Sequence, residues 1–220
     1  MDKKENILGT ESIGKLLVKY SVPAIIGMMV SALYNVVDRI FIGNIPGVGP
    51  MAITGLGVAM PIMSVIIAFG TLIGVGSSTN ISITLGQNKK DEAEHILGNA
   101  LSLAVIIGVF ISIIGTIFLD KLLIMFGASA ETILYAKSYM SIILIGITFS
   151  IMSMMFGNLI RGDGNPKLSA TIMIVGCGLN IILDALFIFG FNMGIQGAAF
   201  ATIISLITSS ILGLSYYLRG

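Results

Sequence analysis

The chain has 220 residues, of which twelve are Lys or Arg, eleven are Asp or Glu and one is His. Charged residues make up 10% of the sequence and hydrophobic residues 55%, whereas soluble domains carry about 25% charged residues. This composition excludes an ordinary soluble protein, and a net charge of +1 excludes the basic surface that nucleic acid requires. One cysteine and one histidine cannot form an internal disulfide or a His/Cys metal cluster. The sequence therefore predicts a membrane protein.

Six segments are long and apolar enough to cross a membrane as helices, because about 20 apolar residues span the ~30 Å hydrocarbon core. They cover residues 20–42, 53–78, 96–119, 138–160, 168–190 and 195–218. The first segment is too long for a signal-peptide core and no small-residue cleavage site follows it, so we expect it to be retained. Short connections favour antiparallel neighbours. We predict an all-α integral membrane protein, with six transmembrane helices forming one bundle over residues 1–220.

Several local features modify this picture of six helices. The polar connection at 86–95 carries both signs of charge, and we expect a solvated segment that leads into the third helix along the membrane surface. Pro23 and Pro61 are expected to interrupt the first and second helices. Glycines inside the spans, among them Gly74, Gly108 and Gly146, are expected to act as close-packing or bending points.

Basic residues outside the spans indicate the orientation of the chain. Nine Lys and Arg residues lie on the side that carries both termini, whereas the opposite side has only Lys121 and Lys137. The positive-inside rule therefore predicts that both termini are cytoplasmic, in a multi-pass protein of the plasma membrane. Arg39, inside the first span, is expected to extend outward or to pair elsewhere.

Two aspartates inside the spans are predicted to lie at the same depth. Asp38 is 19 residues beyond Lys19 and Asp184 is 17 residues beyond Lys167, which places them roughly 28 and 25 Å along helices that run in the same direction. Both carboxylates are therefore expected in the outer part of the membrane. Because a carboxylate in lipid is costly, each should face the bundle interior, a water-filled cavity or a cation. A purely structural role, as a helix cap or an interhelical hydrogen bond, is the alternative.

Other polar side chains are predicted to join these carboxylates. Asn180 lies one turn before Asp184 on the same helical face, and Thr202 lies at comparable depth in the sixth helix. Tyr34, one turn before Asp38, can approach the same face. Carboxylate, amide and hydroxyl oxygens suit a small hard cation such as Na⁺, and a carboxylate in apolar surroundings also suits a proton. The residue types therefore allow either Na⁺ or H⁺ as the bound ion.

Four strings of residues resemble the multidrug and toxic compound extrusion (MATE) family, over the whole chain and in the right order. They are VDRIFIGN at 37–44, LIRGDGNPK at 159–167, NIILDALFIFG at 180–190 and GIQGAAFAT at 194–202. The resemblance implies an antiporter that expels cationic or amphiphilic compounds in exchange for Na⁺ or H⁺, with no cofactor besides the coupling ion. It also implies a cation-binding cluster in the family's N-terminal lobe, matched here by Asp38, Asn180, Asp184 and Thr202, with Tyr34 beside it.

The chain departs from the family in length. Family members look like two six-helix lobes in one chain, and this sequence stops after one. The resemblance therefore implies the N-terminal half of a transporter, as a fragment or as a half that needs a C-terminal lobe or a second copy for transport. Asn158 resembles a further polar position of the family, but its counted depth is near the cytoplasmic end.

Three other classes of membrane protein are alternatives to a MATE-like antiporter. A flippase of lipid-linked precursors in the wider superfamily usually has a basic cavity, and Arg39 is the only basic residue inside a span, which disfavours it. An enzyme is disfavoured because the one histidine lies in a connection and cannot pair with a serine inside the spans. The two aspartates could resemble an aspartyl dyad, which is the feature that would support an enzyme. A membrane scaffold that transports nothing is the remaining alternative.

Overall fold

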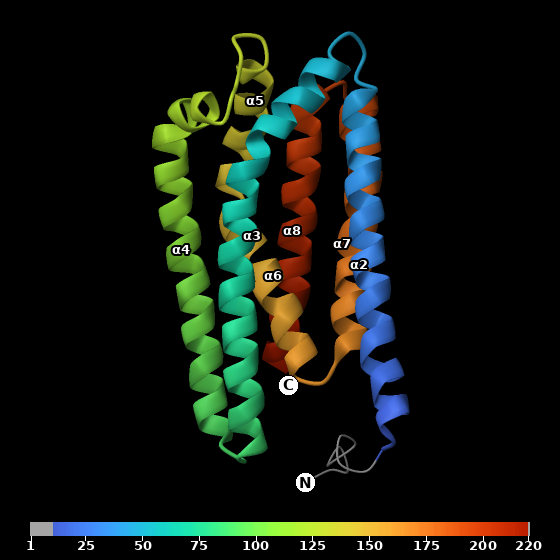
Figure 1. The fold of residues 1–220 in the computed structure, drawn as a ribbon, viewed down its shortest axis with the longest axis vertical. Helices are drawn as coiled ribbons and strands as arrows, with labels where there is room; N and C mark the ends of the chain where they lie inside the picture. Colours follow the sequence, from blue (N-terminus) through green and yellow to red (C-terminus); the bar gives the residue numbers. More distant parts are fainter. Residues whose placement is uncertain (1–10, 220) are drawn as a thin grey trace.

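A computed structural model describes residues 11–219. The described chain forms a bundle of helices without strands (Figure 1). In chain order its helices are α2 (Ile13–Gly43), α3 (Gly49–Gly86), α4 (Lys90–Met125), α5 (Ile133–Ile145), α6 (Ile147–Gly162), α7 (Pro166–Asp184), the π-helix η1 (Ala185–Gly190) and α8 (Gly194–Arg219).

The predicted membrane spans are confirmed as helices. Within the described residues, α2, α3, α4, α7 with η1, and α8 are each long and apolar enough to cross a membrane, and α5 with α6 makes a sixth, bent span. Each predicted segment lies inside one of these units. The all-α, six-helix membrane bundle expected from the sequence is therefore present.

The fourth predicted span, residues 138–160, is not one straight helix. It is divided at Gly146 into α5 and α6, whose axes differ by 62°. A Cβ atom at Gly146 would lie 2.6 Å from Cγ1 of Ile203 on α8, so α8 approaches the backbone at the bend more closely than any side chain permits. The bend falls at Gly146, one of the glycines expected to act as a close-packing or bending point.

Two further expectations are wrong. Pro23 and Pro61 do not interrupt their helices, since α2 and α3 continue through them, as prolines in membrane helices can when neighbouring groups satisfy the freed carbonyl. The polar connection at 86–95 does not run along a membrane surface either. Its second half is the first part of α4, which begins at Lys90 and continues in the same helix to Met125. Its charged side chains are solvent-exposed, as expected.

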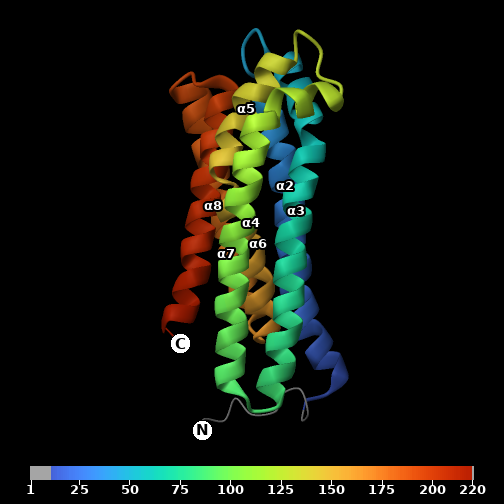
Figure 2. The ribbon, with the colours of Figure 1, turned by 90° about the vertical axis from the view of Figure 1, so that its left-hand side faces the viewer.

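Helices α3 and α4 are longer than a membrane requires. With 38 and 36 residues, they reach about 57 and 54 Å at ~1.5 Å per residue, well beyond the ~30 Å hydrocarbon core. Both extend past the lower end of α8 in two perpendicular views (Figures 1 and 2). The polar connection at 86–95 lies at this projecting end, where its charges meet water.

Small residues let the helices approach closely around α6 and α8. A Cβ at Gly108 of α4 would lie 2.6 Å from the Thr148 hydroxyl, and one at Gly213 of α8 would lie 2.6 Å from Phe156 Cβ. Such close approaches are typical of packing between membrane helices. Helices α2, α7 and α8 also pack against one another, and this contact positions the site described next.

Candidate functional site

The two intramembrane aspartates come together inside the bundle. Asp38 lies near the end of α2, five residues before its last residue, and Asp184 is the last residue of α7. Asp38 is 7% exposed and Asp184 is fully buried. Their side chains are close enough to share a hydrogen bond. The equal depth predicted from the sequence is therefore a direct approach of two carboxyl groups.

Asn180 links Asp184 to α8. With its amide nitrogen facing the carboxylate, Asn180 Nδ2 donates to Asp184 Oδ2 at 2.7 Å, and its oxygen accepts from the Thr202 backbone N–H at 3.1 Å. The opposite orientation offers one 3.4 Å bond to the Thr202 hydroxyl, so the first satisfies more polar groups. Asn180 and Thr202 are both buried. The structure thus gathers Asp38, Asn180, Asp184 and Thr202, which we call the acidic cluster.

The helix that carries Asp184 changes its geometry directly after this residue. The α-helical turns of α7 give way to the π-helix η1, which ends with Phe191 N–H donating to Leu186 O at 2.9 Å. A Cβ at Gly197 of α8 would lie 2.9 Å from the Phe187 backbone carbon, so the wider π-helical turn packs against a glycine. Turns of this kind occur often at functional sites.

Two tyrosines complete the surroundings of the acidic cluster. Tyr34 of α2 is half-buried and lies near Asp38 and Thr202. Tyr139 of α5 is buried and lies near Thr202 and both aspartates. Sequence reasoning missed Tyr139. Its position two residues after Lys137 gave no signal, because a tyrosine at the outer end of a span also fits the membrane interface.

The acidic cluster contains oxygen atoms that the protein itself leaves without partners. Within the described residues, Oδ1 of Asp38 and Oδ1 of Asp184 are buried and accept no hydrogen bond. Buried polar atoms are nearly always paired, and two like charges about 4 Å apart repel by roughly 4 kcal/mol at an effective dielectric constant of 20. A proton or a small cation between the carboxylates would relieve both problems. The donor set of carboxylates, amide and hydroxyl fits Na⁺.

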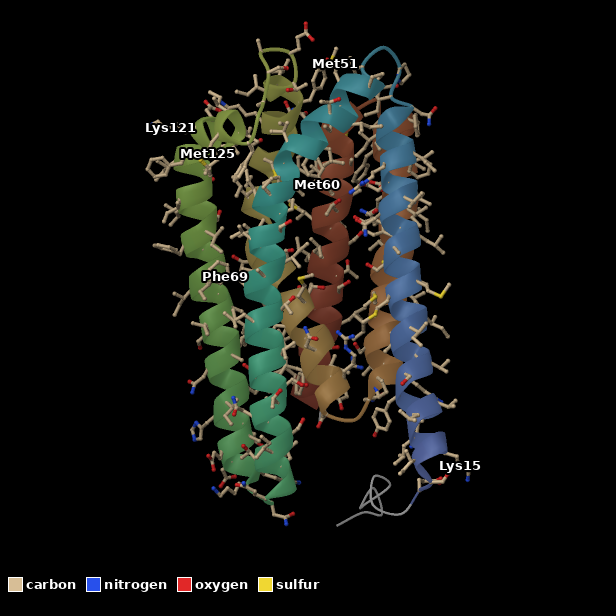
Figure 3. All side chains as sticks on the ribbon, viewed as in Figure 1. Lys15, Met51, Met60, Phe69, Lys121 and Met125 are labelled. Atoms are coloured by element: carbon tan, nitrogen blue, oxygen red, sulfur yellow. The ribbon has the colours of Figure 1, made fainter. Side chains whose placement is uncertain are left out.

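Two other polar residues from the sequence analysis lie elsewhere. Asn158 of α6 accepts from Arg161 at 3.0 Å and donates to the Met154 carbonyl at 2.9 Å, so it belongs to a separate network. Arg39 is exposed, and its guanidinium contacts Met60 Sδ on α3 at 3.6 Å. Met60 lies on the upper half of α3 (Figure 3). Neither Asn158 nor Arg39 contributes a ligand to the acidic cluster.

The helical architecture and the buried acidic cluster define a multi-pass membrane protein with an intramembrane polar site. The MatE family model matches residues 23–186, and the chain belongs to this family. Multidrug export protein MepA of Staphylococcus haemolyticus is 31% identical over 208 residues, covering 94% of this chain and 46% of the relative. MepA of Staphylococcus aureus strain MRSA252 is 27% identical over 206 residues, covering 94% and 45%.

Solved structures agree with this assignment. A crystal structure of MATE in the bent conformation matches with a TM-score of 0.84 and 32% identity, over 92% of this chain and 45% of that one. A crystal structure of MATE in the straight conformation matches with a TM-score of 0.83 and 33% identity, over 92% and 44%. The chain thus spans less than half the length of the curated relatives and solved structures that it matches.

Proposed function

We propose that residues 1–220 form the N-terminal six-helix lobe of a cation-coupled multidrug efflux antiporter, and that the chain is not an enzyme. Membership of the MatE family supports a transporter. The names of the relatives support multidrug export. Their greater length supports a second lobe, supplied by a further segment, a separate chain or a second copy.

The observation that carries this proposal is the pair of buried carboxylates with unpartnered oxygens. In the proposed cycle the acidic cluster takes up Na⁺ or H⁺ from outside and releases it to the cytoplasm, and no other cofactor takes part. A bound cation neutralises the pair and draws α2 toward α7, because Asp38 and Asp184 stand on these two helices. Loss of the cation restores the repulsion and favours their separation.

We propose that α2 converts cation occupancy into movement. Pro23 lies in the opposite half of α2 from Asp38, and a proline inside a helix removes one backbone hydrogen bond and allows bending. The existence of related structures in bent and straight conformations is consistent with such a movement. Bending or shifting of α2 near Pro23 would displace a substrate held beside it.

We further propose a location for the protein and a class of substrate. The excess of Lys and Arg at the end of the bundle that carries Lys15, labelled in Figure 3, supports a cytoplasmic location of both termini in the plasma membrane. The proposed substrates are cationic or amphiphilic small molecules, which exchange with the coupling cation.

Ethidium efflux from cells that express the chain tests this function. Asp38→Asn and Asp184→Asn each keep size and polarity but remove a charge, and each should abolish coupled efflux at unchanged membrane abundance. Asp120→Asn is the matched control, because Asp120 lies in an exposed ion pair with Lys137 and is remote in sequence from the acidic cluster. Efflux at the wild-type rate from both cluster variants would contradict the proposal.

Two further experiments distinguish Na⁺ coupling from H⁺ coupling and a single copy from an assembly of two copies. Efflux driven by an imposed Na⁺ gradient at constant pH indicates Na⁺ coupling, whereas efflux driven only by a pH gradient indicates H⁺. Native mass spectrometry of the purified chain reports whether two copies assemble. A monomer without efflux, which becomes active when a second lobe is co-expressed, would identify the chain as one half of the transporter.

A further inference from the structure

A groove of about 420 Å³ lies between α7 and α8 at the lower end of the bundle in Figure 1, far from the acidic cluster. It is formed by the first two turns of α7 and the last three turns of α8. The lining residues are Leu168, Ile172, Leu212, Ser215, Tyr216 and Arg219. The volume falls in the range of pockets that hold small organic ligands, about 300–1,000 Å³.

The lining changes from apolar to polar along the groove. Ile172 and Leu212 lie farther from the helix ends and are aliphatic, whereas Ser215, Tyr216 and Arg219 occupy the last two turns of α8. The same direction leads from the membrane interior to its surface. A molecule that fits this gradient has a hydrocarbon chain and a polar head.

The polar end of the groove favours a negative head. Arg219 is exposed there, and Lys167 is in the first turn of α7 beside Leu168. The one acidic neighbour, Asp163, already accepts a hydrogen bond from the Tyr216 hydroxyl, which holds the tyrosine ring in the groove wall. Arg219 is thus the cationic side chain of the groove lining, and the carboxylate of Asp163 is already engaged.

We propose that this groove binds an anionic phospholipid of the leaflet at the lower end of the bundle. One acyl chain lies along Leu168, Ile172 and Leu212, and the phosphate of the headgroup contacts Arg219. Basic pockets between membrane helices at the cytoplasmic surface suit such headgroups. This site is independent of the acidic cluster and of transport, so its test does not depend on the proposed function.

Native mass spectrometry of the purified chain, with added phosphatidylglycerol or phosphatidylcholine of identical acyl chains, tests the proposal. Wild-type protein should retain phosphatidylglycerol in preference to phosphatidylcholine. Arg219→Gln should weaken phosphatidylglycerol retention about fivefold, the effect of one basic residue near an anionic lipid. Lys15→Gln, at the same end of the bundle but on α2 (Figure 3), should leave retention unchanged.

A second variant tests the apolar part of the groove. Ile172→Trp fills it and should abolish retention of phosphatidylglycerol while Arg219 stays in place; the thermal midpoint of the variant checks its fold. Equal retention of the two lipids by the wild type, or equal effects of Arg219→Gln and Lys15→Gln, would overturn the proposal. If Ile172→Trp does not fold, the comparison of the two charge variants alone decides.

Discussion

Two polar regions of this bundle differ in how completely their hydrogen bonds are satisfied. At the lower end of α6, Ser169 donates to the Gly157 carbonyl at 2.8 Å, Arg161 donates to Gly157 and to Asn158, and Ser82 donates to the Gly162 carbonyl at 2.9 Å. In the acidic cluster, by contrast, each of the two buried carboxylates has one oxygen without a hydrogen-bond partner among the described residues.

This difference separates a structural network from a binding site. Hydrogen bonds that are complete within the protein stabilise one arrangement of helices. Buried charges that are incompletely paired destabilise the protein until something binds them. The lower network therefore holds α3, α6 and α7 together, whereas the acidic cluster has a reason to bind a cation.

The largest expected effect comes from removing one charge of the pair. At high pH and low Na⁺, Asp184→Asn should raise the free energy of unfolding by about 1–3 kcal/mol, because the repulsion between the carboxylates disappears. The same variant should abolish coupled efflux. Chemical unfolding in detergent and ethidium efflux measure the two effects. Loss of both stability and efflux would assign Asp184 a structural role.

A substitution at Gly146, where α5 and α6 are bent, affects the helix α8 that carries Thr202 of the acidic cluster. Gly146→Ala should lower the free energy of unfolding by about 1–3 kcal/mol, since the new Cβ would overlap Ile203, the residue after Thr202. Thermal unfolding measures the loss. Gly57→Ala is the control, because a Cβ at Gly57 meets no atom within 4 Å. Equal stability of the two variants would show that the close approach at Gly146 is not needed.

Tyr139 offers a test of the edge of the acidic cluster. Tyr139→Phe keeps the buried ring but removes the hydroxyl near Thr202 and the aspartates, so we expect cation affinity to fall by about 1 kcal/mol, or roughly fivefold. Cation-concentration dependence of efflux measures it, with Tyr135→Phe as the control. Wild-type cation dependence in Tyr139→Phe would remove this residue from the site.

The smallest effect is expected in the satisfied network. Ser169→Ala leaves the Gly157 carbonyl without this donor, although Arg161 still donates to it, so stability should fall by about 1 kcal/mol. The cation dependence of efflux should not change. Urea unfolding and efflux kinetics of the same preparation test both statements. A changed cation dependence would show that the network at the lower end of α6 also affects cation binding.

The sequence was sufficient for those features that depend on the cost of charge in a membrane. Asp38 and Asp184 stood out because they interrupt apolar spans, and counting residues placed them at one depth. The same reasoning could not reveal Tyr139, because a tyrosine near a helix end fits the membrane interface without further explanation. Contact between the carboxyl groups also required the packing of α2 against α7.

Backbone irregularities were foreseen only in part, since Gly146 was expected to act as a bending point and the π-helix was not expected at all. The bend at Gly146 and the π-helix after Asp184 both depend on how closely α8 approaches, through Ile203 and Gly197. For Pro23 and Pro61 the sequence predicted a break in the helix that the structure does not have, because the surrounding bundle prevents it. At both prolines the packing of the bundle overrode the local residue preference.

The most direct test of the central claim is cation binding to the purified chain. Radioactive Na⁺ binding and proton release on Na⁺ addition should be measured for the wild type and for Asp38→Asn, Asp184→Asn and Asp120→Asn. The account predicts that the wild type and Asp120→Asn hold one cation per acidic pair, seen as bound Na⁺ or as a titrating proton, and that both cluster variants lose it. A wild-type chain that binds no Na⁺ and titrates like Asp184→Asn would contradict the account.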